Sequence, residues 1–202
     1  MLCKNMERAQ IKEFHFLAPI ANVPSILQHG ILSHNRAKRL PHTDVAMEEI
    51  QEIRAKKKVP GGRALHDYAN LFFNGRNKMM AKKRPQHAEI CVLRIRPEIL
   101  DCPDAVIADQ NGASKYVLFL PSPAGLKKLD RDEVFVRSWV RPGNPFEQWR
   151  LGSKVCAELL VPNRVEPAYV FGAYVVDQGA QSRFEQLNVQ ISCQINSDIF
   201  LR

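Results

Sequence analysis

The stretch SKVCAELLVP, residues 153–162, places one carboxylate, Glu158, inside an otherwise apolar run. In an extended strand alternate side chains point to opposite faces, so Glu158 would share its face with Cys156 and Leu160. Burying an ionised carboxylate without a partner is costly. Three explanations stay open at this point: a charged partner holds Glu158, Glu158 lines a cleft, or the strand lies at a sheet edge and Glu158 points to solvent.

Short apolar runs with strand character occur throughout the rest of the chain. They are bounded by turn residues, and the last one alternates strictly between apolar and polar positions. The predicted strands cover residues 14–17, 90–96, 105–108, 116–120, 155–161, 168–176 and 189–195.

Two helices are predicted before most of these strands. The first begins after Asn22, its N-cap, and ends before Gly30. The second runs from Thr43 or Asp44 to Lys57, with acidic residues at its start and basic residues at its end, as the helix dipole favours. Helices followed by strands indicate the α+β class. No repeat or dividing linker interrupts the pattern, so residues 1–202 are predicted to form a single domain.

Composition and charge narrow the class of protein. Of the 202 residues 45% are hydrophobic and 25% charged, which is typical of a folded globular chain. A net charge of +8 favours an anionic partner, nucleic acid first, although a merely basic soluble surface is the alternative. The apolar stretch at 168–176 is about half the roughly 20 residues that a membrane helix needs. We therefore expect no membrane contact and a cytoplasmic location.

Neither metal nor thiol chemistry is predicted. The five cysteines form no CxxC pair, and we expect them to be reduced and mostly buried. The six histidines never pair at i, i+4, which argues against a zinc helix. Glycine-rich phosphate loops of the GxGxxG and GxxxxGK[ST] kinds are also absent, so a nucleotide site of those two types is excluded.

What remains is a set of isolated polar side chains in apolar or aromatic settings. Each has a structural explanation beside a functional one: His15 suits a satisfied core histidine, Asn22 a helix cap, Arg54 a solvated helix end, and His66 with Tyr68 a turn. Taken one by one, these residues decide nothing.

Taken in order, the motifs are more specific. FHFL at 14–17, GILSHN at 30–35, IQEIRAKKKVPGG at 50–62, LHDYANLFFNGRNKMM at 65–80 and CAELLV at 156–161 resemble the DarT family of bacterial toxins, which ADP-ribosylate DNA. The resemblance covers nearly the whole chain. It implies an ADP-ribosyltransferase-like fold with central, mostly antiparallel strands and N-terminal helices. The segment at 109–123 matches only loosely, and the phenylalanines at positions 14 and 16 also depart from the family pattern.

The resemblance also implies roles for particular residues. Glu158 would be the catalytic glutamate, and Arg54 would hold the phosphates of the co-substrate NAD⁺ and assist the transfer. His15, Asn22, His66 and Tyr68 would contact NAD⁺ as well. The acceptor would be a base in single-stranded DNA, thymine favoured and guanine possible. A partner antitoxin with an ADP-ribosyl-glycohydrolase macrodomain would complete a toxin–antitoxin pair.

The chemistry fits these residue types independently. Loss of nicotinamide develops positive charge on the ribose, which an ionised Glu158 stabilises electrostatically. Glu158 is also suited to accept the proton of an attacking base nitrogen. A neighbouring cation, Arg54 or Lys154, would lower the pKa of Glu158 and counter the effect of burial.

The segment 137–153 combines cations with aromatic rings and carries no consistent period, which predicts a long loop. Cations that follow a phosphate backbone and rings that stack on bases are what a single-strand site requires. The predicted DNA-binding residues are Arg137, Trp139, Arg141, Trp149, Arg150 and, just beyond the loop, Lys154. A core role for the two tryptophans is the alternative.

Two other functions stay open from the sequence. The same fold could act on RNA or protein, or the chain could be a non-enzymatic module that binds single-stranded nucleic acid, with Glu158 incidental. A monomer suffices for any of these mechanisms.

Overall fold

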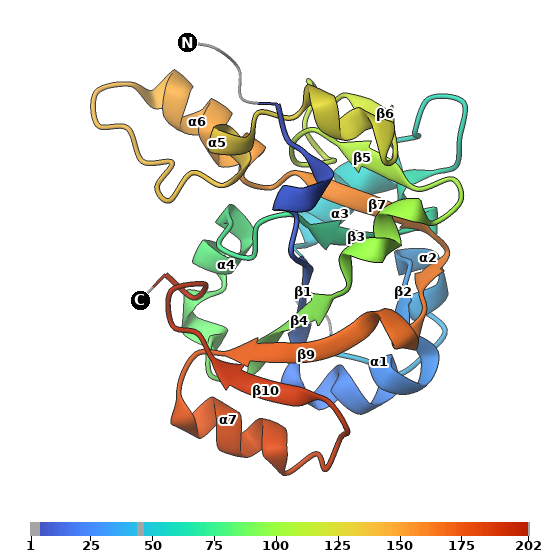
Figure 1. Cartoon of the computed structure of the whole chain (residues 1–202), viewed down its shortest axis with the longest axis vertical. Helices are drawn as coiled ribbons and strands as arrows, with labels where there is room; N and C mark the ends of the chain where they lie inside the picture. The colour runs from blue at the N-terminus through green and yellow to red at the C-terminus, as the bar shows by residue number, and fades with distance from the viewer. Residues whose placement is uncertain (1–4, 44–46, 202) are drawn as a thin grey trace.

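The computed structural model describes residues 5–43 and 47–201. Its centre is an eight-stranded sheet in the order β10-β9-β4-β1-β3-β7-β5-β6 (Figure 1). Along that order the strands are Ser192–Ile195, Val170–Val175, Ile90–Ile95, Phe14–Pro19, Tyr68–Phe72, Glu158–Pro162, Val106–Ala108 and Phe119–Pro121. Only β10 and β9 are parallel, and the other neighbours are antiparallel. The predicted α+β class with mostly antiparallel central strands is confirmed.

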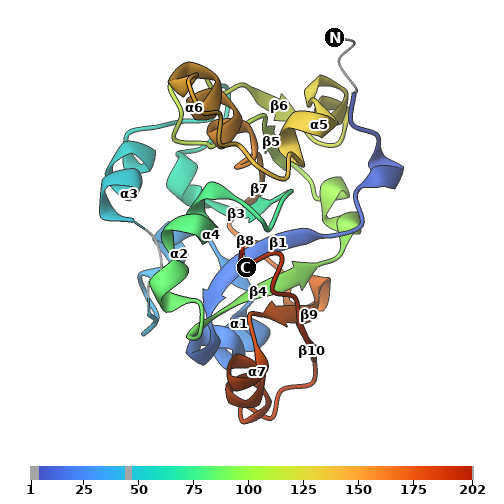
Figure 2. The same cartoon turned by 90° about the vertical axis from the view of Figure 1, so that its left-hand side faces the viewer.

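A small second sheet and the helices surround this one. The second sheet pairs β2 (Ile31–Leu32) with β8 (Arg164–Val165). The α-helices α1 to α7 cover Val23–His29, His34–Ala37, Glu48–Ala55, Lys78–Lys82, Arg131–Val134, Pro145–Lys154 and Gln178–Glu185. Figures 1 and 2 show α5 and α6 at the end of the molecule that carries β5 and β6, and α7 at the opposite end. Three of the helices lie in the second half of the chain, so the prediction of helices first and strands later was wrong in part.

Single turns of 3-10 helix connect several of these elements. They are η1 to η7, covering Arg8–Gln10, Ile20–Asn22, Leu65–Asp67, Arg84–Gln86, Pro97–Asp101, Ala124–Lys128 and Pro167–Tyr169.

Strand β7 runs through the interior of the sheet, between β3 and β5. Leu159 lies opposite Leu71 of β3 and Ile107 of β5, and all three side chains are fully buried in the main hydrophobic core. Glu158 begins the strand and shows 1% exposure. The edge-strand explanation for Glu158 is therefore excluded.

The contact between β1 and β3 is limited. Only His15 and Phe72 are aligned in their register, whereas β1 aligns six residues with β4. The sheet thus consists of two well-paired halves, β10-β9-β4-β1 and β3-β7-β5-β6, that meet at one narrow seam. The prediction missed β3 because its run, YANLF, is short and is interrupted by the polar Asn70.

The loop predicted at 137–153 is only half correct, because α6 begins at Pro145. Asn144 caps this helix by accepting a hydrogen bond from the Glu147 amide (3.0 Å), and proline stands at the first helical position. The apolar residues of this helix are divided between two faces, because Phe146 and Trp149 are exposed whereas Leu151 is buried. The Asn144 cap and the proline at position 145 are the sequence signals of this helix.

The ends of other elements also differ from the predictions. Residues 155–157 lie outside the strand, which begins at Glu158, and 116–118 lie outside β6. Asn22 stands at the N-cap of α1 but does not cap it, because its side chain instead donates to the Thr43 carbonyl (2.7 Å) and accepts from the Thr43 amide (3.2 Å). The second predicted helix is shorter, Glu48–Ala55; of its two predicted starts, Thr43 lies outside the helix and Asp44 lies outside the described residues.

Two further expectations concern the cysteines, expected to be reduced and mostly buried, and contact with a membrane, of which none was expected. Cys91 and Cys156 are buried, Cys102 and Cys193 are partly buried, and all four thiols are free. Burial raises the pKa of Cys156 to about 11. Within residues 5–43 and 47–201, no helix combines the length and apolar character that a bilayer crossing requires. The single-domain organisation of residues 1–202 stays a prediction.

We expect Leu159→Ala to lower the free energy of unfolding by about 2–5 kcal/mol, because it opens a cavity between three interior strands. Leu118, which is 58% exposed, provides the matched control, and Leu118→Ala should change stability by less than about 0.5 kcal/mol. Urea unfolding followed by circular dichroism measures both. Equal effects of the two substitutions would contradict the interior position of β7.

Candidate active site

A cavity of about 440 Å³ opens beside Glu158. Side chains from β1, α1, α2, α3, β3, α4, α6 and β7 line it. Six of the residues predicted from the sequence lie on its walls: Asn22, Arg54, His66, Tyr68, Trp149 and Glu158. These residues come from positions 22 to 158, so the fold gathers them into one site.

The Glu158 carboxylate is held by two donors. Nη1 of Arg54 lies 3.1 Å from each carboxylate oxygen, and the Gly112 amide donates to Oε1 at 3.0 Å. Arg54 is in the last turn of α3 and is only 6% exposed. A buried carboxylate is tolerated when a cation and hydrogen bonds satisfy it. Both the charged-partner and the cleft explanations for Glu158 are therefore correct.

The loop before β6 supplies the second donor, and sequence reasoning missed it. Lys57 donates to the Gly112 carbonyl (3.1 Å) and to the Ser114 carbonyl, and the Asn111 amide donates to Ser153 of α6 (3.0 Å). Burial lowers the pKa of Lys57, and the nearby Arg54 adds to this effect. The end of α3 thus fixes Glu158 directly through Arg54 and indirectly through Lys57. An Asn-Gly turn between two predicted strands was the available signal.

Gly112 is packed closely against the ion pair of Arg54 and Glu158. A Cβ at this position would lie 3.2 Å from Nη1 of Arg54 and 3.4 Å from Oε2 of Glu158. Glycine at this position therefore lets the backbone amide approach the carboxylate without displacing Arg54.

Lys154 occupies a different place from the one expected. Its ammonium lies 2.6 Å from Oδ2 of Asp109, so it forms an ion pair with that carboxylate rather than with Glu158. Asp109 also accepts a hydrogen bond from the Leu118 amide (2.8 Å). Lys154 therefore anchors α6 to the loop that carries Gly112.

His66 offers an unused polar atom to the cavity. It is 7% exposed, and its Nε2 has no hydrogen-bond partner among the described residues. The His34 ring stacks on it at 4.1 Å between centroids. Burial lowers the pKa of His66 to about 4, with further lowering by the charges of His34, Arg54 and Lys38, so His66 is neutral at pH 7. Tyr68 follows on β3 and is 4% exposed.

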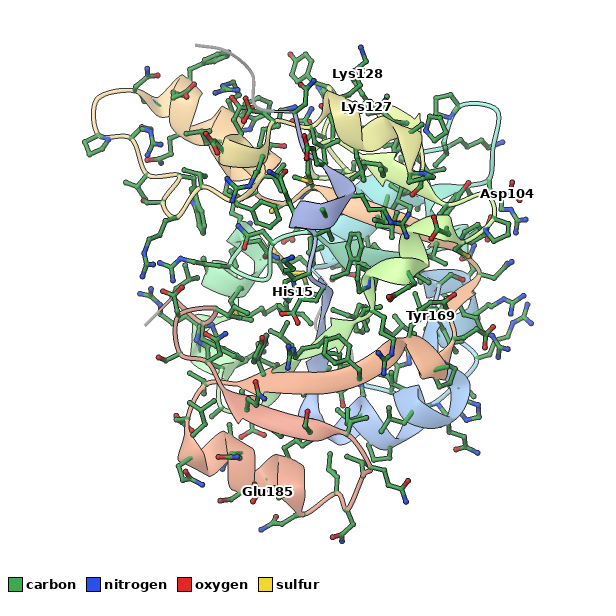
Figure 3. The ribbon with its side chains drawn as sticks, in the orientation of Figure 1. His15, Asp104, Lys127, Lys128, Tyr169 and Glu185 are labelled. Atoms are coloured by element: carbon green, nitrogen blue, oxygen red, sulfur yellow. The ribbon has the colours of Figure 1, made fainter. Side chains whose placement is uncertain are left out.

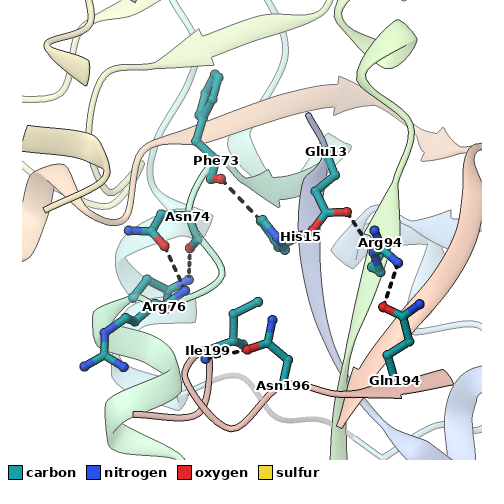
Figure 4. A network of polar contacts seen from close by, with 10 residues as sticks. Glu13, His15, Phe73, Asn74, Arg76, Arg94, Gln194, Asn196 and Ile199 are labelled. Carbon is teal, nitrogen blue, oxygen red and sulfur yellow. Dashed lines mark hydrogen bonds and ion pairs between the residues drawn. The ribbon is translucent and has the colours of Figure 1, made fainter. Parts of the chain in front are cut away.

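His15 does not line this cavity. Its Nδ1 lies 3.3 Å from the Phe73 carbonyl oxygen, and its Nε2 lies 3.2 Å from Oε1 of Glu13 (Figure 4). Arg94 donates to the other oxygen of Glu13 at 2.7 Å. Burial raises the pKa of Glu13, but the hydrogen bonds from His15 and Arg94 outweigh it and bring the pKa to about 2. The structure thus places His15 in a network that joins β1 to β4.

The cations predicted to bind DNA are mostly engaged within the protein. Arg137 pairs with Asp198 at 2.7 Å, and Arg150 pairs with Glu133 at 2.6 Å and with Glu147 at 2.9 Å. Arg141 donates to the carbonyls of residues 138 and 140.

The two tryptophans have different surroundings. Trp139 packs against the cluster of Phe72, Val155 and Cys156, which is the core role. Trp149 is 46% exposed and meets the ring of Tyr116 edge to face, with centroids 5.9 Å apart. Trp149 therefore presents an aromatic surface at the cavity, and Tyr116, 70% exposed, is an aromatic neighbour that the sequence analysis did not single out.

In the described ranges, no group of three or more His, Cys, Asp or Glu side chains lies close enough to hold a metal ion.

Comparison with known proteins gives a consistent result. The family model of DarT, described as ssDNA thymidine ADP-ribosyltransferase, matches residues 14–201. A DNA ADP-ribosyl transferase–DNA ADP-ribosyl glycohydrolase fusion protein of Thermosipho africanus is 29% identical over 186 residues, which are 88% of this chain and 46% of the relative.

Solved structures show the same fold. Thermosipho africanus DarTG in complex with ADP-ribose matches with a TM-score of 0.80 and 25% identity, over 94% of this chain and 51% of that one. Thermus sp. 2.9 DarT in complex with ADP-ribosylated ssDNA matches with a TM-score of 0.81 and 22% identity, over 98% and 99% of the two chains. The chain thus spans about half the length of its Thermosipho africanus relatives.

The lowered pKa of His66 predicts that the stability of the fold depends on pH. Its pKa is about 4 in the fold against an ordinary 6.5, so between these values the unfolded chain binds more protons. We expect the free energy of unfolding to fall by at most about 1.4 kcal/mol per pH unit on acidification from pH 6.5 towards 4 because of this group. His66→Gln should lose this contribution, whereas the exposed His42→Gln should keep it. Urea unfolding at several pH values tests this; an unchanged slope in His66→Gln contradicts it.

Proposed function

Because the chain belongs to the DarT family of single-stranded DNA thymidine ADP-ribosyltransferases, we propose that it transfers ADP-ribose from NAD⁺ to thymidine in single-stranded DNA. The observation that carries this proposal is the buried carboxylate of Glu158, ion-paired with Arg54 and bonded to the Gly112 amide on the wall of a cavity. The cavity volume lies in the range of small-molecule sites, roughly 300–1,000 Å³.

The residues present suit NAD⁺. The neutral His66 offers an unsatisfied Nε2, Asn22 offers an amide at the cavity wall, and Arg54 is a fixed cation for phosphate oxygens. These roles, and that of Tyr68, follow the predictions from the family resemblance. The proposed contact of His15 with NAD⁺ stays a prediction, and its geometry favours support of β1 instead.

The two oxygens of Glu158 are differently occupied. Oε1 accepts from both Arg54 and Gly112, while Oε2 accepts only from Arg54 among the described residues. Oε2 therefore keeps capacity for a ribose hydroxyl or for a proton. In the proposed reaction the bond between ribose C1′ and nicotinamide breaks, a ring nitrogen of the base bonds to C1′, and the proton of that nitrogen passes to Glu158.

A single-stranded acceptor follows from the position of that nitrogen. Base pairing occupies it in a duplex, and extracting the base would cost a few kcal/mol. Thymine is favoured over guanine because the family model specifies thymidine. Action on RNA or protein is the alternative. The binding-only function is less well supported, since three of the cations it would use are paired with carboxylates.

The wider context is also a proposal. The Thermosipho africanus relative is a fusion of a transferase with a glycohydrolase. We propose by analogy a toxin whose antitoxin is an ADP-ribosyl-glycohydrolase macrodomain. Cytoplasmic action follows from the DNA substrate, and a monomer stays the predicted state.

We expect the protein to add one ADP-ribose to thymidine-containing single-stranded oligonucleotides, and Glu158→Gln to lower kcat by at least about 100-fold, as for loss of one preorganised electrostatic contact. Mass spectrometry of oligonucleotides incubated with NAD⁺ measures both. Thermal unfolding of Glu158→Gln separates lost catalysis from lost structure. No mass gain on any DNA, with labelling of RNA or protein instead, would favour the alternative.

Gly112→Ala keeps the carboxylate but crowds it. Because the new methyl group would lie 3.2 Å from Nη1 of Arg54, we expect kcat to fall by roughly tenfold through misplacement of the ion pair. Gly179→Ala, on α7, introduces the same methyl group where the nearest atom is 3.5 Å away, and kcat should be unchanged. Single-turnover rates with saturating NAD⁺ compare the two, and equal rates would argue against a positioning role of the Gly112 loop.

A further inference from the structure

The cavity wall has an excess of positive charge. Three Lys or Arg side chains line it, Arg54, Lys78 and Lys82, against one carboxylate, Glu158. Arg54 is bound to Glu158, which leaves two cations. Neither the Lys78 ammonium nor the Lys82 ammonium forms a hydrogen bond or ion pair within the described ranges. Two unneutralised ammonium groups on a cavity wall favour an anionic occupant.

These two lysines lie on one face of α4, and the second is more exposed than the first. They stand at the first and last positions of α4, four residues apart, so they share a face of the helix. Lys78 is partly buried and Lys82 is exposed. Figure 2 shows α4 below α6. A Cβ on Gly152 of α6 would lie 3.3 Å from Nζ of Lys78, so this ammonium reaches the underside of the helix that presents Trp149.

We propose that Lys78 and Lys82 bind backbone phosphates of the acceptor DNA strand, next to the nucleotide whose base enters the cavity. This inference rests on the proposed function. An enclosed small ligand has no need of the exposed Lys82, whereas a strand that continues beyond the cavity passes over it. Trp149, on the facing helix, supplies a surface for base stacking. The α4 cations are available without first breaking an ion pair, unlike Arg137, Arg150 and Lys154.

The test is the salt dependence of DNA binding. Fluorescence anisotropy of a labelled thymidine-containing oligonucleotide, without NAD⁺, gives the affinity between 50 and 200 mM salt for the wild type and for the Lys78→Gln/Lys82→Gln variant. Each lost phosphate contact reduces the slope of log K against log salt by about 0.7. We expect a reduction of about 1.4, so that the variant loses about sevenfold less affinity across this salt range than the wild type.

The matched control removes the same charge elsewhere. Lys127 and Lys128 are exposed on η6 and do not line the cavity. They are labelled at the top of Figure 3, whereas His15 lies near its middle. Lys127→Gln/Lys128→Gln should keep the wild-type slope, and Lys78→Arg/Lys82→Arg should restore it.

The NAD⁺ diphosphate is the other source of the same chemistry, so NAD⁺ affinity is measured by calorimetry in parallel. An unchanged NAD⁺ affinity with a reduced slope supports the proposal. A weakened NAD⁺ affinity with an unchanged slope assigns the lysines to NAD⁺ and overturns it, as does a change in neither quantity. If the wild type modifies no oligonucleotide, the proposed function fails. If the wild type modifies DNA but the variant keeps the wild-type salt slope, only this inference fails.

Discussion

The contact between Arg54 and Glu158 fixes how α3, β7 and the loop of Gly112 must be positioned relative to one another. A carboxylate that is 1% exposed needs a cation at hydrogen-bond distance to offset the cost of its burial. Helix α3 ends where Arg54 reaches β7, Lys57 of the same helix end holds the loop of Gly112, and the Gly112 amide completes the coordination of Glu158. Three segments far apart in the sequence are thus positioned for one functional group.

The sequence predicted more of the site than of the elements around it. Glu158 was identifiable because a charge inside an apolar run requires an explanation, and Arg54 because the order of motifs matched a family. Asn111-Gly112 was identifiable as a turn between two predicted strands, but the contacts of Gly112 and Lys57 were not, since they are made with backbone groups and depend on the course of the loop. Helix α6 was missed because Phe146 and Trp149 lie on a different face from the buried Leu151, and β3 because Asn70 interrupts a run of only five residues.

Charge was also only partly predictable from the sequence. The net charge of +8 correctly indicates a basic molecule, but residue type alone does not say which cations are neutralised. Arg137, Arg150 and Lys154 look like a DNA footprint in the sequence, yet each has a carboxylate neighbour in the fold. Lys78, inside the motif at 65–80, and Lys82, just beyond it, have no carboxylate partner among the described residues, and only the three-dimensional arrangement separates the two groups.

The narrow seam between β1 and β3 has a consequence for how the molecule resists unfolding. One aligned pair of residues provides little backbone pairing between the two half-sheets, so we expect the backbone to open more readily at the seam than within either half. The cavity spans that seam, with Asn22 on one side and Glu158 on the other. A dinucleotide bound there would contact both half-sheets and stabilise their association. By mass action, each tenfold rise in its free concentration above the dissociation constant would add about 1.4 kcal/mol to the free energy of unfolding.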